Sequence, residues 1–436
     1  MTDFVVFVIH FLLLGAVAAY FIIKEKNTSK TYLLFFVLIM KVLAGWALGV
    51  LYFYYYKDGD TIQYHLEAQK AFHKLSPSIV NYLKYVFLND YTVVGYGEKM
   101  YPTAFAFYKL ITPLYGFCGG NYLLMSMYCS IFSGLGVYRL LLIINNLYPK
   151  FFYPLLISLL LFPSVLLWSA GLMREPIVIG AMCFLLVFAL KWKSKHRLTW
   201  WEILTIPIFF YWILIFKYYY FMAFVPMLTL IIINRWKLKA FTVSILSIAF
   251  FIIFIFIIQK IHLNFTLSKL IPLVVANHDG NIEFSYYSVK GRAINPQNVV
   301  LFYHLDANAS NFLHNLPKAL YAGLFLPQIT DINNLVKIPT GIENTFLFFL
   351  FLFSMVKILY FKDYQILKSK EFLWCIVFIL PLALILPLTS PNLGSLARYK
   401  VAYLPLLAAI LIYYSGICEF LKLAPFLKNE AGIKNT

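Results

Sequence analysis

The sequence predicts an all-α polytopic integral membrane protein, a single membrane domain over residues 1–436 with about 11 transmembrane helices. Three observations predict this class. The chain is 62% hydrophobic and only 12% charged, and its mean hydropathy is +0.79. A soluble domain of this size could not bury so much apolar surface, so membrane lipids are its main solvent. Apolar runs of spanning length recur along the chain, and basic residues gather between them.

Each predicted helix is an apolar run that approaches or exceeds the minimum of about 17 residues needed to cross a bilayer. The runs are 4–23, 32–56, 122–144, 151–170, 177–190, 203–216, 220–233, 240–258, 346–361, 372–388 and 401–418. The first run lacks the basic n-region and the small-residue cleavage site of a signal peptide, so we expect it to remain as a helix.

Five basic clusters orient these helices. They are Lys24, Lys26 and Lys30; Lys191, Lys193, Lys195 and Arg197; Arg235, Lys237 and Lys239; Lys362, Lys368 and Lys370; and Lys422, Lys428 and Lys434. All five fall inside if the N-terminus is outside and the C-terminus inside. This requires that segment 103–117 does not cross, so we expect an interfacial or re-entrant helix there. The alternative is a twelfth span, with some basic loops on the wrong side.

Two large extracytoplasmic loops follow from this orientation, at residues 57–121 and 259–344. The orientation also accounts for the net charge of +18, so we expect no nucleic-acid partner. The five cysteines have no metal-ligand spacing, and most lie in or beside apolar runs. We therefore expect a multi-pass protein of the bacterial cytoplasmic (inner) membrane.

The first loop begins with Asp58-Gly59-Asp60, directly after the apolar segment 31–56. A carboxylate at a membrane–water boundary can serve as a general base, because desolvation raises its pKa. Two carboxylates one residue apart can also chelate a divalent cation such as Mg²⁺ or Mn²⁺. The alternative is that they only cap a helix over 61–74.

Three further residues make the acidic segment more polar than a helix cap requires. Tyr64 and His65 lie one turn along the predicted helix, and Glu67 occupies a neighbouring face. We therefore take Asp58 and Asp60 as candidate catalytic and metal-binding residues. Tyr64, His65 and Glu67 are candidate substrate-binding residues.

Two short outer turns add cations suited to an anionic ligand. Arg174 and Glu175 stand between apolar runs, and a guanidinium near a helix N-terminus suits phosphate. A surface ion pair or snorkelling to headgroups is the alternative. Arg398 and Lys400 lie on the outer face, against the positive-inside trend, which favours an anionic substrate over contact with anionic lipid. All four are candidate substrate-binding residues.

Other polar segments give weaker signals. Tyrosines in segment 217–220 are typical of interfacial anchors, which we favour over a binding role there. The second loop carries polar candidates without a recognisable spacing, namely His278, Asp279, Glu283, Lys290, Arg292, His304, Asp306 and His314. A histidine metal site in that loop has little support from the sequence.

Taken in order, these motifs resemble the GT-C class of membrane glycosyltransferases. Those enzymes carry acidic residues in the first large extracytoplasmic loop, as Asp58-Gly59-Asp60 does here. Segment 101–116 resembles that loop's membrane-parallel helix. Phe162-Pro163-Ser164, followed by Arg174-Glu175, is similar to a Pro/Ser segment that ends in a charged pair. Arg398-Tyr399 resembles a late arginine–tyrosine element.

The resemblance implies inverting transfer of a sugar from a polyprenyl-phosphate-linked donor to a glycan, lipid or protein acceptor. Asp58 or Asp60 would deprotonate the acceptor hydroxyl, and Arg174 and Arg398 would hold the leaving phosphate. Members of the class differ in their need for a metal, so no cofactor is certain and a divalent cation stays open. One departure is that helix 4–23 precedes the span that delivers the acidic pair.

Two other functions stay open. Polymerases of surface polysaccharides also have many helices, large outer loops and essential arginines, and there Arg174 and Arg398 would matter more than the aspartates. A transporter or flippase for an anionic lipid-linked sugar is the third possibility. Transporters usually place polar groups near the bilayer midplane, whereas polarity here is concentrated in the outer loops. This distribution favours an enzyme.

Overall fold

The computed structural model describes residues 2–24, 27–76, 78–88, 92–95, 102–236, 242, 267–287, 298–332, 334–362, 364 and 368–421. Within these ranges the chain is helical and contains no β-strand; an isolated bridge joins Val299 and Asn392. The predicted all-α class is therefore confirmed for the described residues. Predicted run 240–258 lies outside them, except for residue 242.

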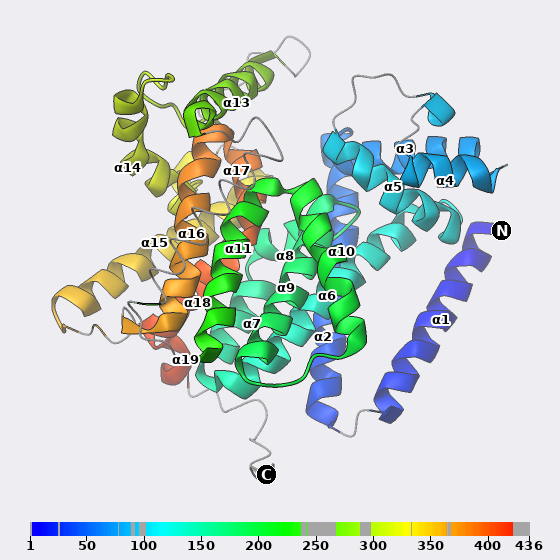
Figure 1. Ribbon diagram of the computed structural model, residues 1–436, viewed down its shortest axis with the longest axis horizontal. Helices are drawn as coiled ribbons and strands as arrows, with labels where there is room; N and C mark the ends of the chain where they lie inside the picture. Colours follow the sequence, from blue (N-terminus) through cyan, green and yellow to red (C-terminus); the bar gives the residue numbers. More distant parts are fainter. Residues whose placement is uncertain are drawn as a thin grey trace.

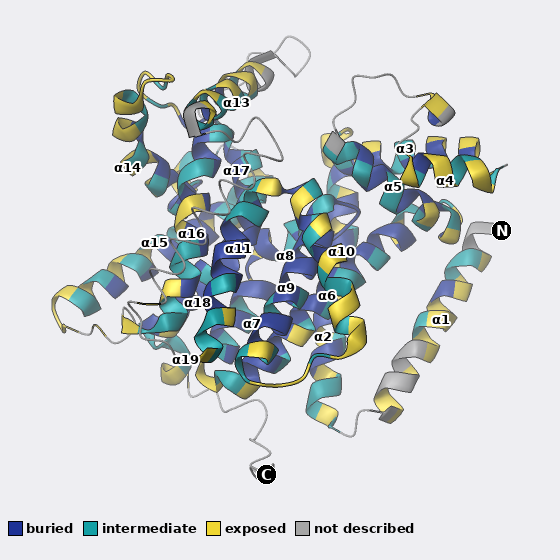
Figure 2. Cartoon of the chain, viewed as in Figure 1, coloured by how far each residue is buried: buried dark blue, intermediate teal, exposed yellow. Residues whose placement is uncertain are grey.

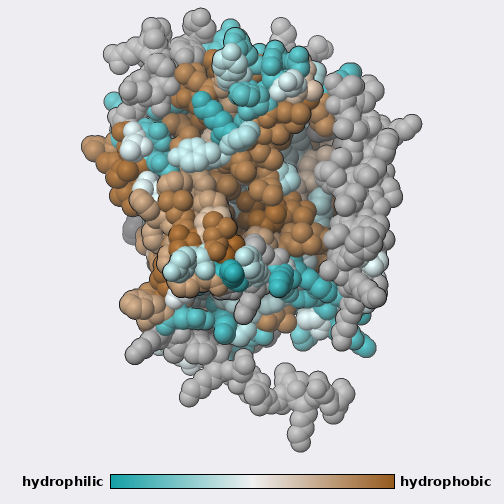
Figure 3. All heavy atoms as spheres, turned by 90° about the vertical axis from the view of Figure 1, so that its left-hand side faces the viewer, coloured by the Kyte–Doolittle hydropathy of each residue, from teal (hydrophilic) through white to brown (hydrophobic). Residues whose placement is uncertain are grey.

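Six described helices are long and apolar enough to cross a membrane, which makes the chain a multi-pass membrane protein. They are α2 (Thr28–Val50) with its π-helical extension (Leu51–Tyr56), α6 (Tyr122–Leu147), α9 (Arg174–Lys193), α11 (Tyr218–Ile233), α15 (Ile338–Leu359) and α16 (Lys370–Thr389). A seventh span forms if α17 (Leu393–Tyr399) and α18 (Leu404–Ser415), bent by 72°, count as one. Figure 3 shows an apolar band between two polar ends.

Of the remaining predicted runs, some form one continuous helix and others are broken into two. α1 (Thr2–Lys24) and α10 (Trp200–Phe216) fit two of them. Run 151–170 is instead divided into α7 (Phe152–Leu160) and α8 (Pro163–Trp168), because a proline starts a helix readily and cannot continue one. The last run is interrupted where α18 ends, and the short α19 (Ile417–Phe420) follows.

Both predicted outer regions contain helices, and they lie at the same end of the bundle (Figure 1). The first holds α3 (Asp60–Leu75), α4 (Ile79–Phe87) and α5 (Pro102–Phe117). α5 covers the segment expected to be interfacial, and it is not among the helices of spanning length. The second region holds α13 (Leu267–Tyr287) and α14 (Ala309–Phe325), and α15 begins before residue 344 rather than after it.

Helices α6 and α9 form the centre of the bundle, where Figure 2 shows most residues buried, and α2 packs against α6. Glycines let these helices approach closely. A Cβ atom on Gly136 would lie 2.7 Å from the carbonyl oxygen of Gly180, and one on Gly45 would lie 2.9 Å from the nitrogen of Gly171. Small residues permit this contact between membrane helices. It places the start of α9 beside α2.

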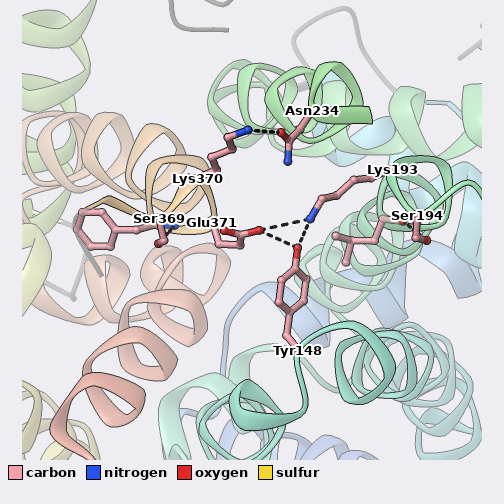
Figure 4. A network of polar contacts seen from close by, with 9 residues as sticks. Tyr148, Lys193, Ser194, Asn234, Ser369, Lys370 and Glu371 are labelled. Carbon is pink, nitrogen blue, oxygen red and sulfur yellow. Dashed lines mark hydrogen bonds and ion pairs between the residues drawn. The ribbon is translucent and has the colours of Figure 1, made fainter. Parts of the chain in front are cut away.

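The other end of the bundle is joined by a polar network shown in Figure 4, which we call the lysine network. Lys193, at the end of α9, donates hydrogen bonds to the Tyr148 hydroxyl and to Glu371 Oε1 of α16. Tyr148 donates to the same carboxylate over 3.0 Å, and Lys370 donates to Asn234 over 3.1 Å. The network therefore connects α6, α9, α11 and α16.

The described basic segments share this end of the bundle. Figure 1 places the end of α1, the start of α2, the α9–α10 connection, the end of α11 and the end of the described chain there, away from α3, α13 and α14. The predicted orientation requires this arrangement, with these segments facing the cytoplasm.

Candidate functional site

The acidic segment changes direction at Gly59. This residue has φ 129°, and a Cβ atom there would lie 2.5 Å from Cε1 of the Tyr52 ring. Only glycine adopts this conformation without strain and fits this space. Asp60 is consequently the first residue of α3, while Asp58 stays exposed and accepts a hydrogen bond from the Gly59 N–H over 2.7 Å. The two aspartates therefore engage different partners.

Asp60 joins a buried group of charges from four parts of the chain. Arg398 of α17 donates from Nη1 to Asp60 Oδ2 over 2.6 Å and from Nε to Glu175 Oε1 over 2.7 Å. Lys217, in the turn between α10 and α11, lies 2.9 Å from the same Glu175 oxygen. The Glu175 side chain is completely buried in the first turn of α9. One carboxylate is thus held between two cations.

Arg174 completes this group, which we call the arginine cluster (Asp60, Arg174, Glu175, Lys217 and Arg398). Its Nη1 donates to Thr103 Oγ1 of α5 over 3.1 Å, and its guanidinium carbon lies 5.6 Å from the centre of the Tyr64 ring. Among the described residues Arg174 forms no ion pair within 4.0 Å. It is therefore a cation without an acidic partner of its own.

The charges of the arginine cluster do not balance. Three cations face two carboxylates, which leaves one positive charge in excess. Two buried donors, Arg174 Nε and Arg398 Nη2, also have no hydrogen-bond partner within the described residues. Unsatisfied buried donors are costly, and arginines bind phosphate through charge-assisted, often bidentate hydrogen bonds. The cluster is therefore chemically suited to an anionic group such as a phosphate.

The turn before α9 is fixed from three helices. The buried Lys41 of α2 donates to the Ser169 hydroxyl and, over 3.4 Å, to its carbonyl oxygen. The Gly171 N–H donates to Ser130 of α6 over 2.9 Å, and Thr61 of α3 donates to the Leu172 carbonyl over 2.9 Å. These bonds hold Arg174 and Glu175 at the start of α9 in a defined position.

Lys217 is the functional candidate that sequence reasoning missed. The sequence predicts interfacial tyrosine anchors in segment 217–220; Tyr218 is exposed as an anchor would be, whereas Tyr220 is completely buried and donates to the Tyr399 carbonyl over 2.7 Å. Lys217 is instead buried against Glu175, 4.3 Å from the centre of the Tyr399 ring. Burial lowers the pKa of Lys217 to about 8, although Glu175 opposes that change. A signal was present, because this lysine is a cation on the predicted outer face, as Arg398 is.

Two predicted substrate-binding residues on α3 lie away from the cluster's ion pairs. His65 packs beside the rings of Tyr115 and Tyr122, and burial lowers the pKa of its imidazole. The carboxylate of Glu67 lies 3.8 Å from Lys70 on the same helix. Tyr64, by contrast, lies under Arg174 and is buried, which raises the pKa of its hydroxyl. The face of α3 that carries Tyr64 is therefore the one turned toward the cluster.

Lys400 does not lie beside the other predicted substrate-binding residues, although its position near Arg398 in the sequence suggested that it would. It is completely buried and donates to the carbonyls of Leu324 and Leu326, over 3.1 and 3.0 Å, and to Asn344 Oδ1 over 2.8 Å. It lies two residues after Arg398, at the point where α17 ends and a 3-10 turn begins. Its side chain therefore points in a different direction and binds α14 and α15. In this structure it joins helices rather than facing the cluster.

The predicted metal-binding role of Asp58 and Asp60 is not tested by this geometry. The described residues contain no group of three or more His, Cys, Asp or Glu side chains that could hold a metal ion. Asp60 Oδ2 accepts a hydrogen bond from Arg398, and Asp58 Oδ1 accepts one from the Gly59 N–H. A divalent cation stays a prediction of the sequence alone.

Five of the nine predicted site residues therefore come together: Asp60, Tyr64, Arg174, Glu175 and Arg398. Comparison with protein-family models, curated proteins and solved structures found no significant match. The functional argument rests on this convergence, which joins residues more than 330 positions apart in the chain.

Proposed function

We propose that the protein is an inverting membrane glycosyltransferase that uses a polyprenyl-phosphate-linked sugar as donor. It transfers the sugar to a glycan, lipid or protein acceptor at the extracytoplasmic face of the bacterial cytoplasmic membrane. The observation that carries the proposal is the arginine cluster. It combines a carboxylate accessible to solvent with cations in excess, at one end of a bundle of membrane-spanning helices.

Asp60 is the general base in this proposal. Its side chain is 39% exposed, and among the described residues only its Oδ2 atom has a partner, so Oδ1 is available to an acceptor hydroxyl. Asp60 accepts the hydroxyl proton as the acceptor oxygen bonds to the anomeric carbon. The bond from that carbon to the phosphate oxygen breaks, and the phosphate leaves with the electron pair.

Arg174 and Arg398 hold the departing phosphate. The single excess positive charge of the cluster matches the single negative charge of a phosphodiester, which favours a monophosphate-linked donor over a diphosphate-linked one. The phosphate gains negative charge as its bond to the sugar breaks. Arginines fixed beside it therefore stabilise the transition state more than the bound donor, which is the condition for catalysis.

The sharpest test compares the two aspartates. Asp60→Asn should lower sugar transfer by about 10²–10⁴-fold, the usual contribution of a general base. Asp58→Asn is the matched control, because Asp58 is exposed and, within the described part of the chain, bonds only in its own turn. Transfer is measured in membranes that contain equal amounts of each inserted variant. Full activity of Asp60→Asn would overturn its assignment as base.

A polysaccharide polymerase is the second candidate, and the convergence of Arg174 and Arg398 favours it as well. Mass spectra of lipid-linked saccharides and surface glycans from cells with and without the gene separate the two. A glycan or lipid-linked intermediate that is short by one sugar identifies a transferase. Complete repeat units that never lengthen identify a polymerase.

A further inference from the structure

An exposed aromatic and polar surface lies on α14 and the segment before it, apart from the arginine cluster. Tyr303 is 67% exposed. Its ring centre lies 4.3 Å from that of His304 and 6.0 Å from that of His314, both edge-on. Asn311 precedes His314 by one turn of α14, so the two share a face. We call these four residues the tyrosine surface.

The backbone of Tyr303 is held by a buried side chain. Asn315 is 2% exposed; it accepts a hydrogen bond from the Tyr303 N–H over 3.0 Å and donates to the Tyr303 carbonyl over 2.8 Å. His304 has φ 38°, a left-handed conformation that is uncommon outside glycine and often found at ligand sites. Asn311 donates to Asp306 over 2.8 Å. The surface is therefore preorganised, although its aromatic ring faces outward.

The position of the surface separates it from the lipid. Gly323 of α14 faces Ala383 of α16, and Ala319 packs in one apolar cluster with Leu388, next to the last residue of α16. The N-terminal part of α14 therefore extends beyond the end of the membrane-spanning helix α16. His314 lies five residues beyond Ala319, roughly 8 Å farther out at the rise of a helix. This location favours a water-soluble ligand over a lipid anchor.

The chemistry of the surface points to a neutral carbohydrate. A tyrosine ring offers an apolar face to the C–H side of a sugar ring, while histidine and asparagine exchange hydrogen bonds with its hydroxyls. None of the four side chains is a carboxylate, lysine or arginine, and the carboxylate that one of them contacts, Asp306, accepts a hydrogen bond from Asn311. We infer that the tyrosine surface binds sugar residues of the acceptor glycan, remote from the reacting hydroxyl. The identity of the glycan as acceptor rests on the proposed function.

The test uses the full chain in nanodiscs and oligosaccharides released by mild acid from the surface of cells that carry the gene. Saturation-transfer NMR, with no donor present, measures binding. Tyr303→Ala should raise the Kd roughly tenfold, which corresponds to about 1.4 kcal/mol and is usual for a central tyrosine contact. Tyr360→Ala is the matched control, because Tyr360 is 78% exposed at the end of α15. His314→Ala should weaken binding in the same direction.

Two outcomes would overturn the inference: no oligosaccharide binding by the folded wild-type protein, or equal binding by Tyr303→Ala and the wild type. The Asp60→Asn variant separates this inference from the proposed function. It should lose transfer but bind the oligosaccharides as the wild type does. A protein that transfers sugar yet binds equally well without Tyr303 would retain the proposed function and lose this site.

Discussion

The arginine cluster and the lysine network lie at opposite ends of α9, and they use charge in different ways. α9 begins at Arg174 and ends at Lys193, so the two sites lie at the two ends of a 20-residue helix, roughly 30 Å long. In the lysine network Lys193 meets the carboxylate of Glu371, Tyr148 hydrogen-bonds to both, and the second lysine, Lys370, donates to Asn234. In the arginine cluster the cations outnumber the carboxylates, and buried donors lack partners within the described residues.

This difference separates a structural connection from a candidate binding site. The Lys193–Glu371 pair of the lysine network is partly open to water, with Lys193 20% and Glu371 42% exposed, and the two charges of this pair cancel. Such a pair needs no ligand and contributes little to stability. The arginine cluster holds a fully buried Glu175 and an uncancelled positive charge. Proteins tolerate such a cost where function requires it.

The largest expected effect comes from removing the buried carboxylate. Glu175→Gln leaves Lys217 without its acidic partner and Arg398 with only Asp60. Removing one member of a buried ion pair typically costs about 3–5 kcal/mol, so the thermal unfolding temperature in detergent should fall sharply. Transfer should fall with it, because Arg398 loses one of its two anchors.

A melting temperature equal to that of the wild type would show that Glu175 does not neutralise these cations in the folded protein. Glu175→Asp is the informative companion variant. It keeps the charge but shortens the side chain, so it should retain more stability than Glu175→Gln.

The second effect is on activity rather than on stability. Arg174→Ala removes the cation that has no acidic partner among the residues the structure describes, so the fold should lose little, while transfer should fall by about 10²–10³-fold. Arg235→Ala is the matched control near the lysine network, where the arginine lies 4.1 Å from the centre of the Trp192 ring. Initial rates at saturating and limiting donor give kcat and KM. Equal loss in both arginine variants would contradict a phosphate-binding role specific to Arg174.

The sequence predicted the all-α, multi-pass class correctly, because hydropathy depends on composition and needs no tertiary contacts. Six of its 11 predicted runs, or seven with the bent pair, correspond to described helices of spanning length. It also identified Arg398, since a cation on the predicted outer face opposes the positive-inside trend. Lys217 carried the same signal, but its three tyrosine neighbours favoured an anchoring role. Lys400 could not be separated from Arg398 without the bend after α17, which directs the two side chains to different helices. The contacts among residues of α3, α9 and α17 depend on how these helices pack, so the sequence alone could not predict them.

The smallest expected effect belongs to Glu371→Gln in the lysine network. The variant leaves Lys193 without its carboxylate, but both side chains are partly exposed, so water can solvate the lysine. Tyr148 and the ring of Trp374, 4.7 Å from the ammonium, also remain in place. We expect a loss of at most about 1 kcal/mol in unfolding free energy and unchanged transfer. Melting curves and initial rates, measured beside Glu175→Gln, check both expectations. If Glu371→Gln abolished transfer while the protein stayed folded, the burial of the ion pairs would not distinguish the two ends of α9, and the lysine network would be part of the functional machinery.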